Sequence, residues 1–254
     1  MSARAELRVE QLSAGYGGTP VVNQVSLTVG GEHVTLVIGP NGSGKSTLAK
    51  ALAGVIPKMG GRVVLDGADI TSVLSHQLVR MGIGYVPQVR DVFDPLTVSE
   101  NLQVSAYTLD RNTFEARRDA VVEVFPRLAE LRKRLAVNLS GGERKMLAIA
   151  RVLLLEPSIV IIDEPTAGLS PRLAEEVLTD HVVRIAAAGA GVLLIEQRAA
   201  DALKIADDVC VMAGGSVKLR TSAKDPSRHE DIVQAMLGEH TGNGNLQPLG
   251  DEAV

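Results

Sequence analysis

The sequence predicts an α/β protein with a mostly parallel sheet, and three observations lead to this fold class. Residues 34–38 and 159–162 are continuous apolar runs too short for helices, which is typical of parallel strands buried on both faces. A glycine-rich turn and a helix-forming stretch follow the first run, as in a strand–turn–helix unit. Residues 6–30 and 61–66 instead alternate apolar and polar residues between glycine turns, which indicates an N-terminal antiparallel β subdomain beside the core.

The glycine-rich turn reads GPNGSGKS and matches the phosphate-binding P-loop pattern, so that the core is expected to be of the P-loop NTPase type. Glycines let successive backbone N–H groups turn toward phosphate oxygens, and the start of the following helix adds positive partial charge. Lys45 is expected to reach the outer phosphates, and the Ser46 hydroxyl is expected to ligate Mg²⁺. The predicted nucleotide-binding residues here are Gly39, Pro40, Asn41, Gly42, Ser43, Gly44, Lys45, Ser46 and Thr47.

The next segment, residues 89–142, changes to charged, helical patterns and is predicted to form an inserted helical subdomain. Helices are expected over residues 98–108 and 113–134. Pro126 lies inside the second pattern and should break or kink that helix near Phe125. A rotation of this insert would move the string that follows it, LSGGE.

LSGGE occupies residues 139–143 and is the most discriminating string. Ser140, Gly141 and Gly142 precede a stretch of good helix formers, so a hydroxyl and bare backbone amides lie at a helix N-terminus. The same residues fit an ordinary capping box in which Glu143 is the partner of Ser140, and both interpretations can hold together. A nucleotide bound by the P-loop does not need this second anion site. We therefore expect it to bind the γ-phosphate of ATP held by a second copy.

Two adjacent carboxylates, Asp163 and Glu164, end the second apolar run. They would lie at the carboxyl end of a buried parallel strand, where open α/β sheets bind ligands. There Asp163 can face the magnesium ion, while Glu164 orients and deprotonates a water beside the γ-phosphate. The alternative, a DEP triplet that only ends a strand, is less favoured because a P-loop precedes it.

The remaining chain is predicted to complete one domain. Parallel strands are expected at residues 191–195 and 209–212, and a crossing helix at 171–187. The tail at 238–254 is rich in Gly, Asn and Pro and is expected to be flexible. The expected division is a single domain at 1–237 made of the β subdomain with the P-loop (6–66), the helical subdomain (89–142) and the rest of the core (143–237).

With these three strings in order, the chain resembles the ATP-binding subunits of ABC transporters over nearly all of residues 6–237. The resemblance implies an ABC ATPase fold and hydrolysis of ATP with Mg²⁺. It assigns Tyr16 to adenine stacking and Gln88 to a link between magnesium, the attacking water and a membrane partner. Family members usually carry a histidine where this chain has Gln197, and glutamine can donate a hydrogen bond but cannot carry a proton at this position.

The resemblance thus implies three groups of site residues. The catalytic residues are Glu164, Lys45, Gln88 and Gln197. The metal-binding residues are Ser46, Gln88 and Asp163. The ATP contacts come from Tyr16, residues 39–47, and Ser140, Gly141, Gly142 and Glu143 of a second copy.

The sequence at Gln197, LSGGE in place of LSGGQ, and the run VFDPLTVSENL after Gln88 are similar to the ATPase subunits of importers for branched-chain or other hydrophobic amino acids. Importers of urea and short amides resemble these closely, so the substrate stays open. The implied partners are transmembrane permease subunits, a second identical or related ATPase subunit, and indirectly a substrate-binding protein. The implied location is peripheral, on the cytoplasmic face of the cell membrane.

Composition and missing motifs limit the other functions. The net charge of −4, with no basic block longer than Arg132-Lys133-Arg134, gives no reason to expect nucleic acid. The N-terminus lacks a signal-like apolar core and no stretch approaches ~20 apolar residues, so no spanning helix is expected. A GTPase would need an Asn-Lys-x-Asp motif, and a DNA-repair ABC ATPase would need a long coiled-coil insertion. A regulatory ABC ATPase that no longer hydrolyses ATP stays open because of Gln197.

Overall fold

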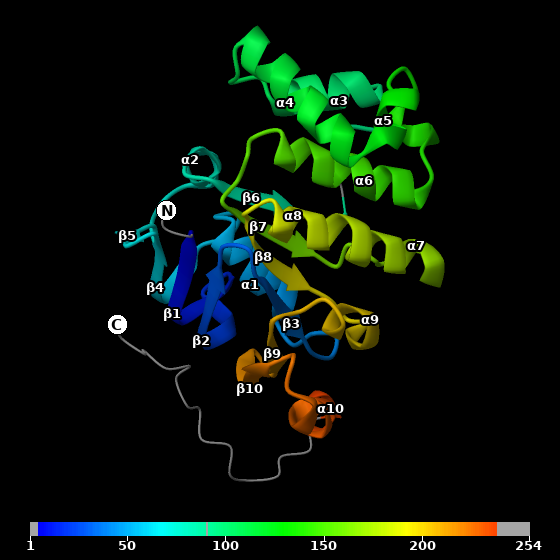
Figure 1. The fold of residues 1–254 in the computed structure, drawn as a ribbon. Coiled ribbons are helices and arrows are strands. Elements are labelled where there is room, and N and C mark those ends of the chain that lie inside the picture. The colour runs from blue at the N-terminus through cyan, green and yellow to red at the C-terminus, as the bar shows by residue number, and fades with distance from the viewer. Residues whose placement is uncertain (1–4, 90, 238–254) are drawn as a thin grey trace, which may run out of the picture.

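The structure, a computed structural model, describes residues 5–89 and 91–237, so the expected tail at 238–254 lies outside the described residues. Its larger sheet has the strand order β10-β9-β3-β8-β7-β6 (Figure 1). The strands are β3 Val34–Ile38, β6 Ile83–Val86, β7 Ile159–Asp163, β8 Gly191–Ile195, β9 Asp208–Ala213 and β10 Ser216–Ser222. All neighbours pair in parallel except β10, which pairs antiparallel with β9. The predicted parallel core is confirmed.

The smaller sheet is antiparallel, as predicted, with the strand order β2-β1-β4-β5. Its strands are β1 Glu6–Tyr16, β2 Thr19–Gly30, β4 Lys58–Leu65 and β5 Ala68–Asp69. Gly17 and Gly18 form the turn between β1 and β2 with φ of +55° and +83°, a conformation that costs glycine little. This sheet covers one face of the larger sheet and so closes the domain on that side.

Alternate residues of the parallel strands enter two separate hydrophobic cores. Val37 faces the core shared with the antiparallel sheet and with helix α1, Lys45–Leu52. Leu36 and Ile38 face the opposite core, which helices of the insert and of the C-terminal half cover, while Leu78 belongs to the core of Val37. Burial on both faces explains why these strands read as continuous apolar runs in the sequence.

The inserted helices stand above the sheet in Figure 1. They are α3 Val98–Ser105, α4 Arg111–Val124, α5 Pro126–Glu130, a 3₁₀ turn at Ala136–Asn138, and α6 Gly141–Leu153. The predicted break at Pro126 is confirmed, because α4 ends at Val124 with Phe125 as its C-cap residue, and Pro126 opens α5 as its first residue. Side-chain caps fix the starts of α3 and α4. The Thr97 side chain accepts a hydrogen bond from the Glu100 amide, and the Asp110 side chain accepts one from the Thr113 amide.

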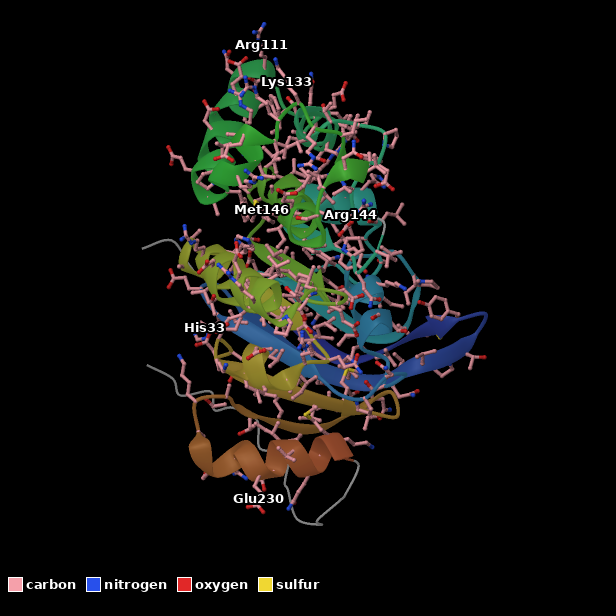
Figure 2. The ribbon with its side chains drawn as sticks, turned by 90° about the vertical axis from the view of Figure 1, so that its right-hand side faces the viewer. His33, Arg111, Lys133, Arg144, Met146 and Glu230 are labelled. Atoms are coloured by element: carbon pink, nitrogen blue, oxygen red, sulfur yellow. The ribbon has the colours of Figure 1, made fainter. Side chains whose placement is uncertain are left out.

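The other helices flank the sheet, and the expected helix at 171–187 forms as three consecutive parts. The helical segments are α2 Ser75–Arg80, α7 Pro171–Glu176, a π-helical turn Val177–Val182, α8 Val183–Ala187, α9 Ala199–Leu203, a 3₁₀ turn Pro226–Arg228 and α10 His229–Leu237. Figure 2 shows Arg111 and Lys133 at one end of the molecule and Glu230 of α10 at the other. Within the described part of the chain, no helix combines the length and apolar character needed to cross a membrane.

Candidate functional site

The predicted site residues follow strands that end at one edge of the parallel sheet. The P-loop follows β3, Gln88 follows β6, Asp163 and Glu164 close β7, and Gln197 follows β8. Since β3, β8, β7 and β6 are consecutive parallel neighbours, their carboxyl ends meet at the same edge. Segments more than a hundred residues apart in the chain are thereby brought into one site, at the place where such sheets bind ligands.

The P-loop backbone turns tightly between β3 and α1. Gly44 is the N-cap residue of α1 and has a left-handed φ of +98°, and Gly42 has a φ of +78°. Gly39 is required for a different reason, because a Cβ there would lie 2.0 Å from the backbone oxygen of Met212 on β9. The loop therefore depends on glycine both for backbone conformation and for close approach to a neighbouring strand.

Gly39→Ala is expected to displace the loop and to weaken both folding and nucleotide binding. Backbone of β9 cannot shift to admit a methyl group at 2.0 Å, so overpacking should cost about 1–3 kcal/mol or more. Thermal melting and MgATP titration of the full chain measure the two effects. Gly214→Ala is the control, since Gly214 also has a positive φ, +56°, but a Cβ there meets nothing within 4 Å. Equal effects of both variants would contradict the steric explanation.

The Lys45 ammonium lies buried inside this loop. Its Nζ donates to the carbonyl oxygens of Gly39 at 2.8 Å and Pro40 at 3.1 Å. Burial lowers the pKa of Lys45, while the nearby carboxylates of Glu164 and Asp163 act in the opposite direction. A desolvated cation held beside the loop is suited to binding phosphate oxygens.

Ser46 and Asp163 meet at the start of α1. The Ser46 hydroxyl donates to Asp163 Oδ1 at 3.0 Å, although the two residues are 117 positions apart. Burial raises the pKa of Asp163, and the hydrogen bond from Ser46 opposes that shift. A hydroxyl and a carboxylate are the hard oxygen ligands that Mg²⁺ prefers. The buried Ser43 hydroxyl, which has no hydrogen-bond partner among the described residues, adds a further polar group to the loop. These residues fit magnesium and a triphosphate.

Gln88 and Glu164 form a second polar pair. The Gln88 amide donates to Glu164 Oε2 at 2.7 Å. Glu164 itself has a left-handed backbone with φ of +45°, which costs a residue with a Cβ roughly 1–2 kcal/mol. Its amide donates to Ile195 O at 2.8 Å, and its carbonyl accepts from Ala167 at 3.2 Å. The surrounding structure thus holds this carboxylate in a fixed and strained position.

The LSGGE string caps α6 as one of its two interpretations predicts. The Glu143 amide donates to Ser140 Oγ at 3.3 Å, and the Ser140 amide donates to Glu143 Oε2 at 3.0 Å. This box uses a lone pair of the Ser140 hydroxyl, and hydrogen bonds from the Ser140 amide and side chain help to lower the pKa of Glu143. Ser140 and Gly141 are exposed, and Figure 1 places α6 among the inserted helices, apart from α1. Gly141, the first residue of α6, is exposed, so its backbone amide can meet an anion from outside. In contrast, Gly142 is buried and the Glu143 amide is bonded to Ser140.

The structure therefore brings part of the predicted site together in one chain. Hydrogen bonds join Lys45 to the P-loop, Ser46 to Asp163, and Gln88 to Glu164. Tyr16 is half-exposed at the end of β1, and the side chain of Gln197 is exposed after β8. Among the hydrogen bonds of the described residues, none joins residues 140–143 to the P-loop.

Sequence reasoning missed two polar groups near the site. Glu196 is buried at the end of β8, where burial raises its pKa and hydrogen bonds from Thr166 oppose the shift. A carboxylate after an apolar run, the signal that revealed Asp163, could have found it.

The second group ties the segment after Gln88 to α6. Lys145 Nζ donates to the Gln88 carbonyl at 2.7 Å and to Asp91 Oδ2 at 2.8 Å, and Arg144 lies 3.3 Å from Asp91. Lys145 and Asp91 are both buried. No local pattern could reveal this ion pair because its members are 54 residues apart.

Comparison with known proteins yields one family and several relatives. A model described as ABC transporter matches residues 22–167. The chain is 39% identical to a probable branched-chain amino acid transport ATP-binding protein, LivF, of Archaeoglobus fulgidus, over 91% of this chain and 98% of that protein. It is 33% identical to the high-affinity branched-chain amino acid transport ATP-binding protein BraG of Pseudomonas aeruginosa, over 91% and 99%. It is 30% identical to the lipopolysaccharide export system ATP-binding protein LptB of Escherichia coli, over 92% and 98%.

Solved structures give the same picture of the fold. An ATP-binding cassette of an ABC transporter in its ADP conformation has a TM-score of 0.82 and 30% identity, covering 92% of this chain and 99% of that one. A nucleotide-free ATP-binding cassette has a TM-score of 0.81 and 30% identity, covering 91% and 95%.

Proposed function

Because the chain belongs to the ABC transporter family and is an ATPase subunit that works with transmembrane permease subunits, we propose that it powers the import of branched-chain or other hydrophobic amino acids. The observation that carries this proposal is the 39% identity, over almost the full length of both chains, to a protein named for branched-chain amino acid transport. A second relative with such a name is 33% identical, and lipopolysaccharide export proteins are 30% to 32% identical, so the first relative carries the choice of substrate.

The geometry supports a cycle in which two copies close on two MgATP and reopen after hydrolysis. In this proposal Lys45 and the amides of the P-loop bind the phosphates, and Tyr16 stacks on adenine. Ser46, Asp163 and Gln88 hold Mg²⁺, which when bound neutralises phosphate charge. Ser140 donates its hydroxyl proton to the γ-phosphate of the partner copy, with the amides of Gly141 and Gly142 beside it.

Catalysis in this proposal is positioning combined with charge stabilisation. Glu164 accepts a proton from the attacking water, and the Gln88 amide fixes the orientation of that carboxylate. Gln197 donates a hydrogen bond to the γ-phosphate without carrying charge. Glu143 contributes indirectly, since its carboxylate is engaged with Ser140 and with Arg127.

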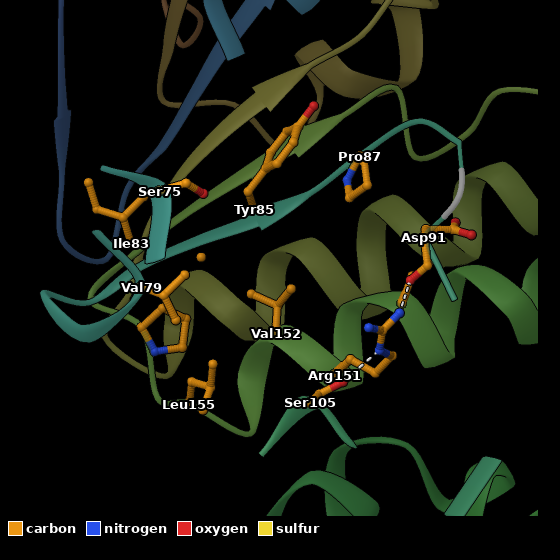
Figure 3. Close-up of a pocket in the computed structure, with 13 residues that line it drawn as sticks. Ser75, Val79, Ile83, Tyr85, Pro87, Asp91, Ser105, Arg151, Val152 and Leu155 are labelled. Carbon is orange, nitrogen blue, oxygen red and sulfur yellow. Dashed lines mark hydrogen bonds between the residues drawn. The ribbon is translucent and has the colours of Figure 1, made fainter. Parts of the chain in front are cut away.

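A cleft of about 360 Å³ between β6 and α6 is the proposed docking place of the permease (Figure 3). Figure 3 shows Val79, Pro87 and Arg151 around it. Val89 and Phe93, on the segment after Gln88, are exposed apolar residues of the same region. A permease segment in this cleft would touch both α6 and the segment that leads from Gln88. Its movement would therefore reach the hydrolytic site and the Ser140 end of α6.

Val79→Asp is expected to abolish stimulation of ATP hydrolysis by the permease while leaving MgATP binding unchanged. Val79 lines this cleft together with the apolar residues Val152 and Leu155, and a charge placed there must lose its hydration when the partner covers it. The measurement is ATPase activity of the purified transporter complex compared with the isolated chain. Val183→Asp on α8 is the matched control, because Val183 is 38% exposed and Val79 is 41% exposed. Full stimulation of the Val79 variant would exclude this cleft as the docking place.

The transport function is tested with the native membrane complex. The tagged chain is purified from membranes of its own organism, its companion subunits are identified by mass spectrometry, and the complex is placed in proteoliposomes. We expect ATP-dependent uptake of leucine, isoleucine or valine. Uptake of urea or short amides, or export of lipopolysaccharide, would replace the proposed substrate. A complex that binds ATP without hydrolysing it would instead support a regulatory ATPase.

A further inference from the structure

The carboxylate of Glu196 joins the loop after β7, at Thr166, to the segment after β8, at Gln197. Its Oε1 accepts from the Thr166 amide at 3.0 Å and from the Thr166 hydroxyl at 2.8 Å. Its Oε2 accepts from the Gln197 amide at 3.1 Å. The residue is 1% exposed, so water does not compete for these bonds. One buried group thus binds two segments, of which one carries Glu164, assigned to the attacking water, and the other carries Gln197, assigned to the γ-phosphate.

The loop that Glu196 holds is the loop of Glu164. Thr166 lies two residues beyond Glu164 and is itself buried. The Glu164 amide is bonded to Ile195 O, immediately before Glu196 in the chain. The left-handed backbone of Glu164 is therefore fixed on one side by β8 and on the other by the turn that Thr166 anchors. A strained residue keeps its conformation only when its surroundings hold it in this way.

We propose that Glu196 is a positioning residue for ATP hydrolysis, which fixes the Glu164 loop and Gln197 relative to each other. This inference rests on the proposed role of Glu164. The position requires an ionised carboxylate because the groups that face it are donors, among them the Thr166 hydroxyl and the backbone N–H groups of Thr166, Gln197 and Arg198. A glutamine would direct its NH₂ group at Gln197 or at Thr166, and one of the two attachments would be lost.

Glu196→Gln tests the proposal in the full chain. Misplacing a reacting group by about 1 Å can cost on the order of 100-fold in rate, so we expect kcat to fall about 10- to 100-fold. The KM for MgATP should change less than kcat. No hydrogen bond of the described residues joins this carboxylate to the P-loop, although its charge acts to raise the pKa of Lys45. A purely structural role would lower the melting temperature without this split between kcat and KM.

Variants of Thr166 keep the test decisive if the Glu196 variant does not fold. Thr166→Val removes the hydroxyl donor and should lower kcat. Thr166→Ser retains the hydroxyl and should have the kcat of the unmodified chain. The control is Thr35→Val. This change removes the hydrogen bond from the buried Thr35 hydroxyl, on β3, to the backbone oxygen of Thr28, on β2. This control should lose stability only. In the double variant of Glu196 and Thr166 the losses in kcat should not add, because both act through one contact.

Two outcomes overturn the inference. In the first, Glu196→Gln and Thr166→Val keep both the kcat and the stability of the unmodified chain. In the second, both lose stability but keep kcat, as the Thr35 variant does. The Glu164→Gln variant separates this failure from failure of the proposed function. If that variant loses turnover while the Glu196 variant keeps it, only the positioning role is wrong. If the Glu164 variant keeps turnover, the proposed hydrolytic base itself is wrong.

Discussion

Glu164→Gln is expected to bind MgATP normally and to lose turnover by about 10²- to 10⁴-fold, the usual contribution of a general base. The amide has nearly the size of the carboxylate, and its oxygen can still accept the bond from Gln88 that holds Glu164 at 2.7 Å. It cannot take a proton from water. Bound ATP therefore persists, and the variant should accumulate as a closed dimer with two nucleotides.

Single-turnover phosphate release and size-exclusion chromatography with MgATP measure the two parts of this prediction. Glu156→Gln is the matched control, because Glu156 has a left-handed φ of +48° against +45° for Glu164. Glu156 pairs with Arg117 at the surface, away from the sheet edge that carries the site. Normal turnover in the Glu164 variant would remove the assigned base. Failure of the trapped variant to dimerise, alone or with its permease, would remove the shared site.

Lys45→Met is expected to weaken MgATP binding by about 100-fold or more, since hydrogen bonds to charged groups contribute roughly 1.5–3 kcal/mol each. Methionine retains the apolar stem of lysine but has no ammonium to bind phosphate oxygens. The fold should persist, because the hydrogen bonds that Lys45 Nζ makes to the described residues go to two carbonyl oxygens of its own loop.

Calorimetric titration and the rise in melting temperature with MgATP measure this second effect. Lys58→Met is the control, since burial lowers the pKa of Lys58 as it does that of Lys45, but Lys58 starts β4 in the antiparallel sheet. An unchanged affinity in the Lys45 variant would show that the loop amides alone bind the phosphates.

The strongest local signals explain which parts could be predicted. Residues 34–38 and 159–162 are buried on both faces, so their apolar runs identified parallel strands, and the charged groups at their ends identified the site. Pro126 located a helix boundary because its ring excludes it from a helix interior. In contrast, β10 was not predicted. Its residues are mostly half-buried at the sheet edge, so its pattern is weak.

Contacts between distant segments set the limit of sequence reasoning at the site. Each of Ser46, Gln88, Asp163 and Glu164 could be chosen from a motif. Their hydrogen-bond pairing depends on the order of β3, β8, β7 and β6, which no local pattern specifies. The LSGGE string shows a related limit. Within one chain its capping box is complete, so a role toward a second copy depends on exposed groups that only the assembled pair would use.

The hydrogen bond from Lys145 to the Gln88 carbonyl couples movement of α6 to the position of Gln88. Because α6 carries Lys145, any swing of the inserted helices relative to the sheet draws the Gln88 backbone with it, while Glu164 stays with β7. The carboxylate would then lose the amide that orients it. We expect such a subunit to hydrolyse little ATP while its inserted helices are swung away from the sheet, since hydrolysis and the movement of these helices depend on the same bond.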